Sequence, residues 1–105
     1  MRNGKYNAIP TVIDGIRFDS KAEARRYQQL ILLERAGEIT GLEIHKRFRL
    51  HAGIVYECDF LYEENGKKVA EDVKGMETQA FKIKKKLFRV DHPQIELRII
   101  SSGDV

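Results

Sequence analysis

Two acids and a lysine occupy one short stretch of the chain, the sequence VAEDVKG from Val69 to Gly75. Its apolar flanks are typical of a buried strand, where charged side chains are rare unless each one has a partner. The types and spacing of Asp72 and Lys74 therefore raise the question of what lies opposite them.

The dipeptide Asn65-Gly66 just before this stretch is the strongest short hairpin signal that a sequence offers. A two-residue loop there places Asp59 opposite Asp72 and Glu57 opposite Lys74. Directly opposed residues share one face of a sheet, with Cβ atoms about 4.5–5.5 Å apart. We therefore predict that one face carries two facing aspartates with a lysine beside them.

Facing carboxylates repel each other, so the pair persists only if one is protonated or a cation lies between them. With no thiol or imidazole nearby, two carboxylates favour a hard, oxygen-binding ion, Mg²⁺ or Mn²⁺. A lysine beside such an ion can orient a water or stabilise charge on a phosphate. Asp59, Asp72 and Lys74 together predict a site for phosphodiester hydrolysis.

Other interpretations of the same residues stay open. Glu57 and Lys74 could form a simple cross-strand ion pair, and Asp59 could lie in solvent near a helix lysine. A longer turn would also shift the register. Glu71 points to the opposite face from Asp72, so we expect it to meet solvent or a structural partner.

The rest of the chain predicts the elements that position these residues. A hairpin turns at Asp14-Gly15, a helix begins at Ser20 and ends near Gly37, and a second helix begins at Thr78. The expected elements are the hairpin 11–20, the helix 20–39, strands 42–50, 54–64 and 67–75, the helix 78–90 and the strand 94–100. This order predicts one α/β domain over residues 11–105 with a mixed sheet, after a flexible basic arm over residues 1–10.

Glu23 follows Ser20 by three residues, so it fits a capping box as well as a site role. His45, His51 and His92 are scattered over strand and loop positions, and we interpret them as structural or substrate-facing.

Composition is that of an ordinary globular protein, since 42% of the residues are hydrophobic and 33% are charged. No apolar run approaches the length of a membrane span, and no signal-peptide core is present. Cys58 is the only cysteine, which excludes an internal disulfide framework and favours a reducing compartment. No histidine and cysteine spacing suits zinc.

The net charge is only +3, but QAFKIKKKLFR over residues 79–89 holds five basic residues and no acid. Such a stripe is typical of a phosphate-binding face, and a solvated helix face is the alternative. We expect Ala80, Ile83, Leu87 and Val90 to form the core-facing side of this helix.

Glu23 on a helix, Asp59 on a strand and Asp72-Val73-Lys74 on the next strand resemble the PD-(D/E)XK nuclease superfamily. The resemblance implies a restriction-endonuclease-like αβββαβ core, the order predicted above. More narrowly, VIDGIRFDSKAEARRYQQL, YECDFLY and VAEDVKG look like small uncharacterised phage and prophage proteins of that superfamily. The likeness runs from about Lys5 to Ile100.

Carried over by resemblance, Asp59 and Asp72 match the motif acids, Lys74 the catalytic lysine and Glu23 the additional helix acid. Cys58 stands where the motif often has proline, and Asp72 is shorter than the commoner glutamate. The resemblance implies that Asp59, Asp72, the backbone carbonyl of Val73 and Glu23 bind Mg²⁺ or Mn²⁺. DNA contacts are then expected from the second helix, at Gln79, Lys82, Lys85, Lys86 and Arg89.

The implied activity is a metal-dependent DNA endonuclease in the cytoplasm of a bacterial host, acting in phage recombination or replication. Because no base-reading domain is appended, branched or junction DNA is the expected substrate, as for Holliday junction resolvases, which cut as homodimers. This step is an analogy between folds. Two alternatives stay open, a nucleic-acid-binding module that does not cut and a small phage adaptor that binds a host protein.

Overall fold

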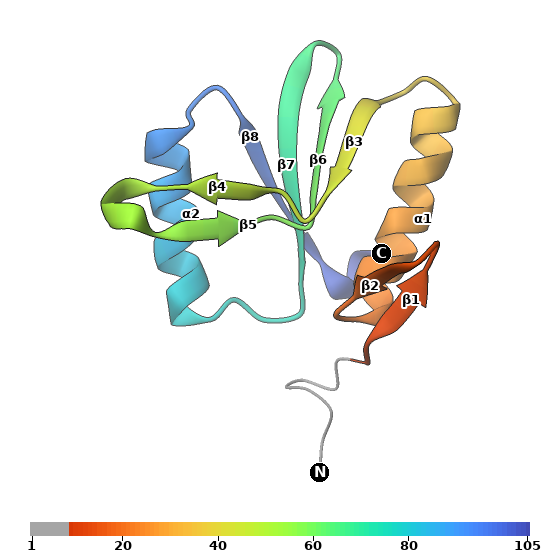
Figure 1. Ribbon diagram of the computed structural model, residues 1–105, viewed down its shortest axis with the longest axis horizontal. Helices are drawn as coiled ribbons and strands as arrows, with labels where there is room; N and C mark the ends of the chain where they lie inside the picture. The colour runs from red at the N-terminus through yellow and green to blue at the C-terminus, as the bar shows by residue number, and fades with distance from the viewer. Residues whose placement is uncertain (1–8) are drawn as a thin grey trace.

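The computed structural model describes residues 9–105 (Figure 1). Most of the arm predicted over residues 1–10 therefore lies outside the described residues. The elements in chain order are β1 (Thr11–Ile13), β2 (Ile16–Phe18), α1 (Lys21–Arg35), β3 (Thr40–Ile44), β4 (Arg47–Arg49), η2 (His51–Gly53), β5 (Val55–Glu57), β6 (Phe60–Glu64), β7 (Lys67–Lys74), α2 (Gln79–Asp91), β8 (Glu96–Ser101) and η3 (Ser102–Asp104).

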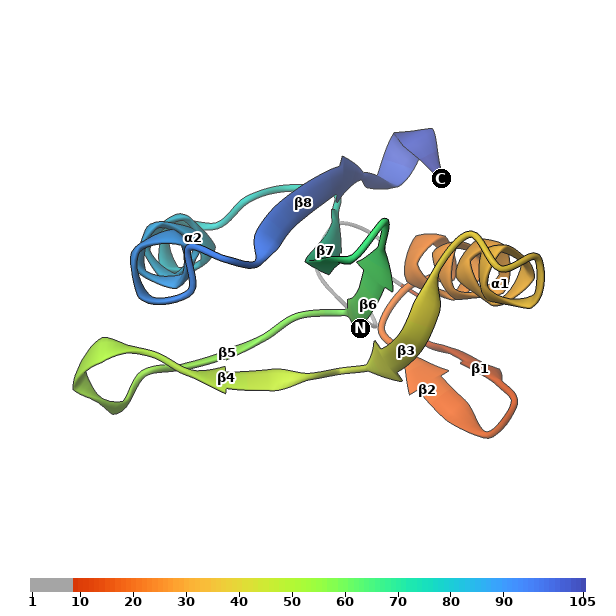
Figure 2. The same ribbon diagram turned by 90° about the horizontal axis from the view of Figure 1, so that it is seen from above.

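A four-stranded sheet of order β3-β6-β7-β8 forms the centre of the molecule. Its pairs are antiparallel except β7 and β8, which are parallel and connected through α2. Figure 2 shows α1 on one face of this sheet and α2 on the other. The predicted α/β domain with a mixed sheet and the order αβββαβ is confirmed, with one hairpin inserted into it.

The two tight turns have the geometry that their sequences predict. Asp14 and Gly15 join β1 to β2, and Asn65 and Gly66 join β6 to β7, with positive φ at all four residues. Such turns match the twist of the strands that they connect, which accounts for their preference for Asn-Gly and Asp-Gly. The β6–β7 register is the predicted one from Glu64 opposite Lys67 to Phe60 opposite Glu71.

Both helices begin at the predicted capping residues. The Ser20 side chain accepts from the Glu23 N–H, and the Thr78 side chain accepts from the Phe81 N–H. At the end of α1, Gly37 has a φ of 80°. The N–H groups of Gly37 and Glu38 then satisfy two of the last helical carbonyls. Neither helix in the described part of the chain is long and apolar enough to cross a bilayer.

Two of the predicted strands are each broken into two shorter strands, so their predicted lengths were wrong. Residues 42–50 divide at His45, which has a φ of 55°, and residues 54–64 divide at Cys58 and Asp59. The pieces β4 and β5 leave the sheet and pair with each other as a separate hairpin beside α2 (Figures 1 and 2).

Aromatic packing explains the departure of this hairpin. Phe48 on β4 and Tyr56 on β5 both meet Phe88 of α2, with ring centroids 5.0 and 5.4 Å apart. Burying such rings is worth about 1.5–3 kcal/mol each, more than the strand pairing that a longer sheet would add.

The core has two parts, one on each face of the sheet. On the α1 face, residues such as Leu30, Phe60 and Tyr62 pack together, and on the α2 face Leu61, Phe81 and Phe88 do so. The expected core side of α2 was wrong. Ile83 is 50% exposed and Val90 is 73% exposed, and Ala80 is also exposed, while Leu87 is only partly buried.

Candidate functional site

Asp59 and Asp72 meet at the point where the β6–β7 ladder ends. The Asp59 N–H donates to Oδ1 of Asp72 at 3.1 Å, and Oδ2 of Asp59 accepts from the Val73 N–H at 2.8 Å. The predicted neighbourhood of the two acids is therefore present. They meet through a bend, because regular pairing stops at Phe60 and Glu71.

Asp72 is almost wholly buried, with 1% of its surface exposed. The Tyr56 hydroxyl donates to its second carboxylate oxygen. Burial, and then the Asp72 charge, raise the pKa of Tyr56, so this hydroxyl keeps its proton and stays a donor. The hairpin thus supplies one of the groups that hold Asp72 in place.

Three acids around this point carry raised pKa values. Burial raises the pKa of Asp59 to about 9, and the charges of Asp72 and Glu23 add to the effect. Burial also raises the pKa of Asp72, although the hydrogen bond from Tyr56 and the charge of Lys74 act against it. Burial likewise raises the pKa of Glu23, which His45 partly opposes. A bound proton or a cation would relieve the repulsion among these acids.

The donor set fits a hard divalent cation held by two carboxylates. Among residues 9–105, no group of three or more histidine, cysteine, aspartate or glutamate side chains is arranged to bind a metal. Mg²⁺, however, is usually bound through one or two carboxylates and several waters. Asp59 and Asp72 would supply those carboxylates, with the Val73 carbonyl as the further predicted oxygen.

Lys74 ends β7 on the same strand as Asp72, and its charge lowers the pKa of Asp72. Its Nζ lies 4.3 Å from the centroid of the Phe81 ring. The alternative pairing with Glu57 was wrong, since Glu57 lies on β5 and accepts from Nε of Arg47 at 3.0 Å. No acid in the described range forms an ion pair with Lys74, which leaves its charge available to a phosphate.

The backbone and the side chain of Glu23 have different partners. Its backbone N–H completes the cap at Ser20, while Oε2 of its side chain lies 2.9 Å from Nε2 of His45. Glu23 is 5% exposed, and its charge raises the pKa of Asp59, so it lies beside the acidic pair. The backbone N–H of His45 also donates to the Asp59 carbonyl at 2.9 Å.

His45 is thus a member of the site that sequence reasoning missed. Nothing in its sequence neighbourhood distinguishes it from His51 or His92, because it becomes adjacent to Glu23 only when β3 and α1 pack together.

Glu71 points to the opposite face from Asp72, as predicted, and meets a structural partner there. It is fully buried, and its carboxylate accepts from Nε of Arg26 at 2.6 Å and from the Tyr62 hydroxyl at 2.6 Å. The Glu71 carbonyl also accepts from the Asp59 N–H at 3.1 Å. Its role is to anchor β7 beside the site.

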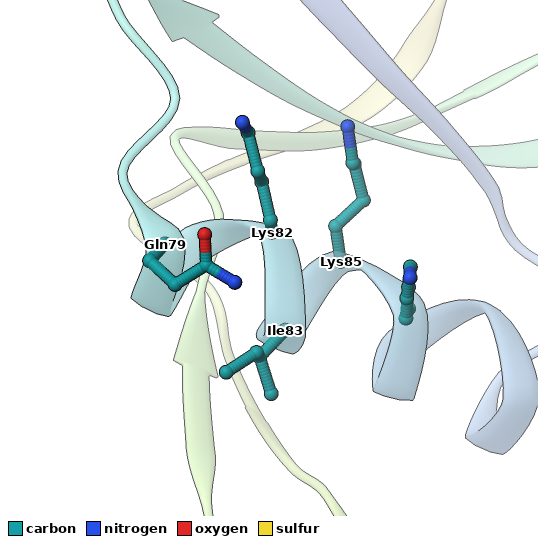
Figure 3. Close-up of a pocket in the computed structure, with 5 residues that line it drawn as sticks. Gln79, Lys82, Ile83 and Lys85 are labelled. Atoms are coloured by element: carbon teal, nitrogen blue, oxygen red, sulfur yellow. The ribbon is translucent and has the colours of Figure 1, made fainter.

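The basic residues expected to contact DNA on α2 fall into two groups, one that is paired with an acid and one that is exposed. Nζ of Lys85 lies 2.5 Å from a carboxylate oxygen of Glu77, so this charge is neutralised. Gln79, Lys82, Ile83, Lys85 and Lys86 line a hollow of about 240 Å³, where Lys82 and Lys85 project to the same side of the helix and Ile83 away from it (Figure 3). Lys82, Lys86 and Arg89 are exposed.

A larger groove of about 510 Å³ separates the β4–β5 hairpin from the first turns of α2. Four of its lining residues are charged and four are apolar or aromatic: Arg47, Glu57, Lys74 and Lys84, and Val55, Tyr56, Ala80 and Phe81. A second hollow of about 370 Å³ lies on the other side of Lys74, beside Ser101. Sequence reasoning missed Arg47 and Lys84, because the hairpin that faces α2 was predicted as parts of two sheet strands.

Comparison with known proteins places the chain in a family. No curated protein matches it, but residues 3–104 match the family model described as "Protein of unknown function (DUF1064)". That match spans the whole α/β domain, including Glu23, Asp59, Asp72 and Lys74. The chain belongs to the DUF1064 family.

Proposed function

We propose that this protein is a metal-dependent endonuclease that hydrolyses DNA phosphodiester bonds. The observation that carries the proposal is the meeting of Asp59 and Asp72, in which the Asp59 N–H donates to Asp72 and the Val73 N–H donates to Asp59. Lys74 lies on the same strand and is in no ion pair within residues 9–105. Two raised carboxyl pKa values at one point are typical of sites that bind a cation or move protons.

Each residue has a distinct role in this proposal. Asp59, Asp72 and the Val73 carbonyl would hold Mg²⁺ or Mn²⁺, and Glu23 adds a third acid at their side. The ion, when bound, lowers the pKa of a water and offsets the charge of the phosphate oxygens. Lys74 stabilises the negative charge that grows on the phosphate as the bond breaks. Tyr56 and Val73 keep the two aspartates in position by donating to them.

Branched or junction DNA is the proposed substrate class, and a homodimer the proposed assembly. The resemblance to PD-(D/E)XK nucleases supports both, together with the small size of the domain, which leaves little surface for reading a base sequence. Phage recombination or replication in a bacterial cell is the proposed setting on the same ground.

A nucleic-acid-binding module that does not cut is the second candidate. The observation that favours it is that basic side chains line two hollows along α2, where they can bind phosphates without a metal. On this alternative the basic surfaces bind phosphates, and Asp59 and Asp72 share a proton instead of an ion.

Cleavage assays separate the two candidates. Supercoiled, single-stranded, flap and four-way-junction DNA are incubated with the protein in Mg²⁺, Mn²⁺ or EDTA. We expect the wild type to cut at least one branched substrate with either metal and none in EDTA. Asp72→Ala and Lys74→Ala should each lower the rate by about 100-fold or more, because the first removes a ligand of the metal and the second removes a cation that stabilises the transition state.

Glu63→Gln and Lys68→Ala are the matched controls, since both residues are exposed on the same hairpin at the end away from the site. They should cut at the wild-type rate. A wild type that binds DNA with a steep salt dependence but cuts none of the substrates would establish the binding module instead.

A further inference from the structure

The groove between the hairpin and α2 has walls that are fixed relative to each other. At the hairpin tip, the N–H and Nδ1 of His51 each lie 2.8 Å from a carboxylate oxygen of Asp91 near the end of α2. Phe48 packs edge-on against Phe88, 5.0 Å between centroids, between the two walls. The hairpin is therefore held against the helix at its tip and at Phe48.

The charge of the groove suits a polyanion. Three cations line it, Arg47 on the hairpin, Lys74 at the end of β7 and Lys84 on α2, together with one acid, Glu57. Arg47 contacts Glu57 through Nε alone, so its two terminal nitrogens can still donate to a phosphate. Within the described chain no ion pair involves Lys74 or Lys84. Two cations outside any ion pair therefore line the groove together with Phe81, Lys74 at the end of β7 and Lys84 on the helix.

Lys84 differs from its neighbours on α2 in the direction that it faces. Residues two apart on an α-helix lie about 200° apart around the axis. Lys82 and Lys86 therefore lie on the far flank from Lys84, and they line a separate hollow that has no hairpin residue in its lining. Figure 3 shows Lys82 at this hollow. The helix thus carries two basic flanks, and only that of Lys84 opens into the groove that contains Lys74.

The remaining lining residues suit nucleobases. Val55, which is 40% exposed, and Ala80 present apolar surface between the cations. Cations beside apolar surface in one groove suit a single strand, because its phosphates can meet lysine and arginine while its unpaired bases rest on the apolar side chains. A duplex keeps its bases paired and presents only phosphates and groove edges to a surface.

We propose that this groove binds one single-stranded DNA segment and leads its backbone past Lys74 toward Asp59 and Asp72. The inference rests on the proposed nuclease function and refines its substrate: the single-stranded arm of a flap or fork enters between the hairpin and α2. Arg47 and Lys84 contact phosphates on opposite walls, and Lys74 contacts the phosphate nearest the aspartates.

Binding in EDTA, where no cleavage occurs, tests the groove directly. A fluorescein-labelled single strand of about 20 thymidines and a duplex of equal length are titrated by anisotropy over a salt series. We expect the wild type to bind the single strand at least about tenfold more tightly than the duplex. Lys84→Glu should weaken single-strand binding about tenfold or more, and Lys84→Ala should lower the slope of log K against log salt by about 0.7.

Lys68→Glu is the matched control, since Lys68 is exposed at the other end of β7 from Lys74, and it should bind the single strand within about twofold of the wild type. Arg47→Ala tests the opposite wall and should also weaken single-strand binding. Equal affinity of the wild type for duplex and single strand would overturn the inference, and so would a Lys68→Glu effect as large as that of Lys84→Glu. Thermal unfolding of each variant shows that it is folded.

The outcomes for the groove and for the nuclease are separable. If Lys84→Glu cuts a flap at the wild-type rate while Asp72→Ala does not cut, the proposal of single-strand binding in the groove fails and the proposed nuclease function stands. If Lys84→Glu loses single-strand binding but the wild type cuts nothing in Mg²⁺ or Mn²⁺, the binding proposal stands and the nuclease function fails.

Discussion

Burial and two neighbouring acids together raise the pKa of the Asp59 carboxyl. Its pKa is raised to about 9, first by burial and then by Asp72 and Glu23, so the metal-free protein holds a proton there at neutral pH. A bound divalent cation would replace that proton. This exchange links three measurable quantities at one residue: stability, pH and metal concentration.

The first prediction follows from the sign of this shift. Because the folded pKa of Asp59 exceeds the unfolded value of about 3.9, its contribution to stability is complete below about pH 4 and is lost as pH rises toward 9. Adding ~10 mM Mg²⁺ should therefore raise the unfolding temperature by several degrees near pH 8.5 and by much less near pH 6. Differential scanning fluorimetry measures both.

Asp59→Asn is the control for this prediction, since asparagine does not titrate. It should flatten the decline of stability between pH 6 and about pH 8.5 and remove most of the Mg²⁺ effect. An equal Mg²⁺ effect in the wild type and the variant would contradict the assignment of Asp59 as a ligand.

At the level of elements, α2 and the β4–β5 hairpin form one unit. The helix buries Phe81 and Phe88 against the hairpin and the sheet, while Ile83 and Val90 face solvent. The expected face was wrong at Ala80, Ile83 and Val90, because the helix has apolar residues on two sides and periodicity alone does not tell them apart. The larger rings are buried, since burying an aromatic side chain removes more apolar surface from water.

The second prediction compares the two faces of α2. Phe88→Ala should lower the free energy of unfolding by about 3–5 kcal/mol, because it leaves a cavity where Phe48 and Tyr56 now pack. Val90→Ala should change it by about 0.5 kcal/mol or less, since Val90 is exposed. Urea denaturation followed by circular dichroism gives both values. A large loss in Val90→Ala would mean that this face is buried in solution.

At the level of the whole molecule, the two helix layers meet the sheet in different ways. The α2 layer is held by aromatic packing, whereas the α1 layer also has a buried ion pair from Arg26 to Glu71 on β7. Tyr62 and Arg98 extend this network to β6 and β8. The same strand carries Asp72 on its other face, so the pair joins the α1 layer to the strand that presents the site.

The third prediction concerns this ion pair. Arg26→Met should lower the free energy of unfolding by about 3–5 kcal/mol, because it leaves the Glu71 charge buried without its partner. Removing both charges in Arg26→Met with Glu71→Met should restore a large part of that loss. Arg25→Met, at an exposed position of the same helix, is the control. Chemical denaturation of the wild type, Arg26→Met, Glu71→Met, the double variant and the control measures the coupling, and additive losses would contradict it.

Short-range features of the molecule were predictable from the sequence. The turns at Asp14-Gly15 and Asn65-Gly66, the caps at Ser20 and Thr78, and the register from Phe60 to Glu64 all follow from chemistry within a few residues. That register was enough to place Asp59 beside Asp72, the central pair of the candidate site.

The sequence by itself therefore determined the order of elements, the tight turns and the neighbourhood of the two aspartates. Only the tertiary structure decided that strands break at His45 and Asp59, that His45 meets Glu23, and that a groove opens between Arg47 and Lys84. The physical reason is the range of the interactions. Backbone geometry and strand alternation are set by adjacent residues, whereas burial is a competition among faces brought together from distant parts of the chain.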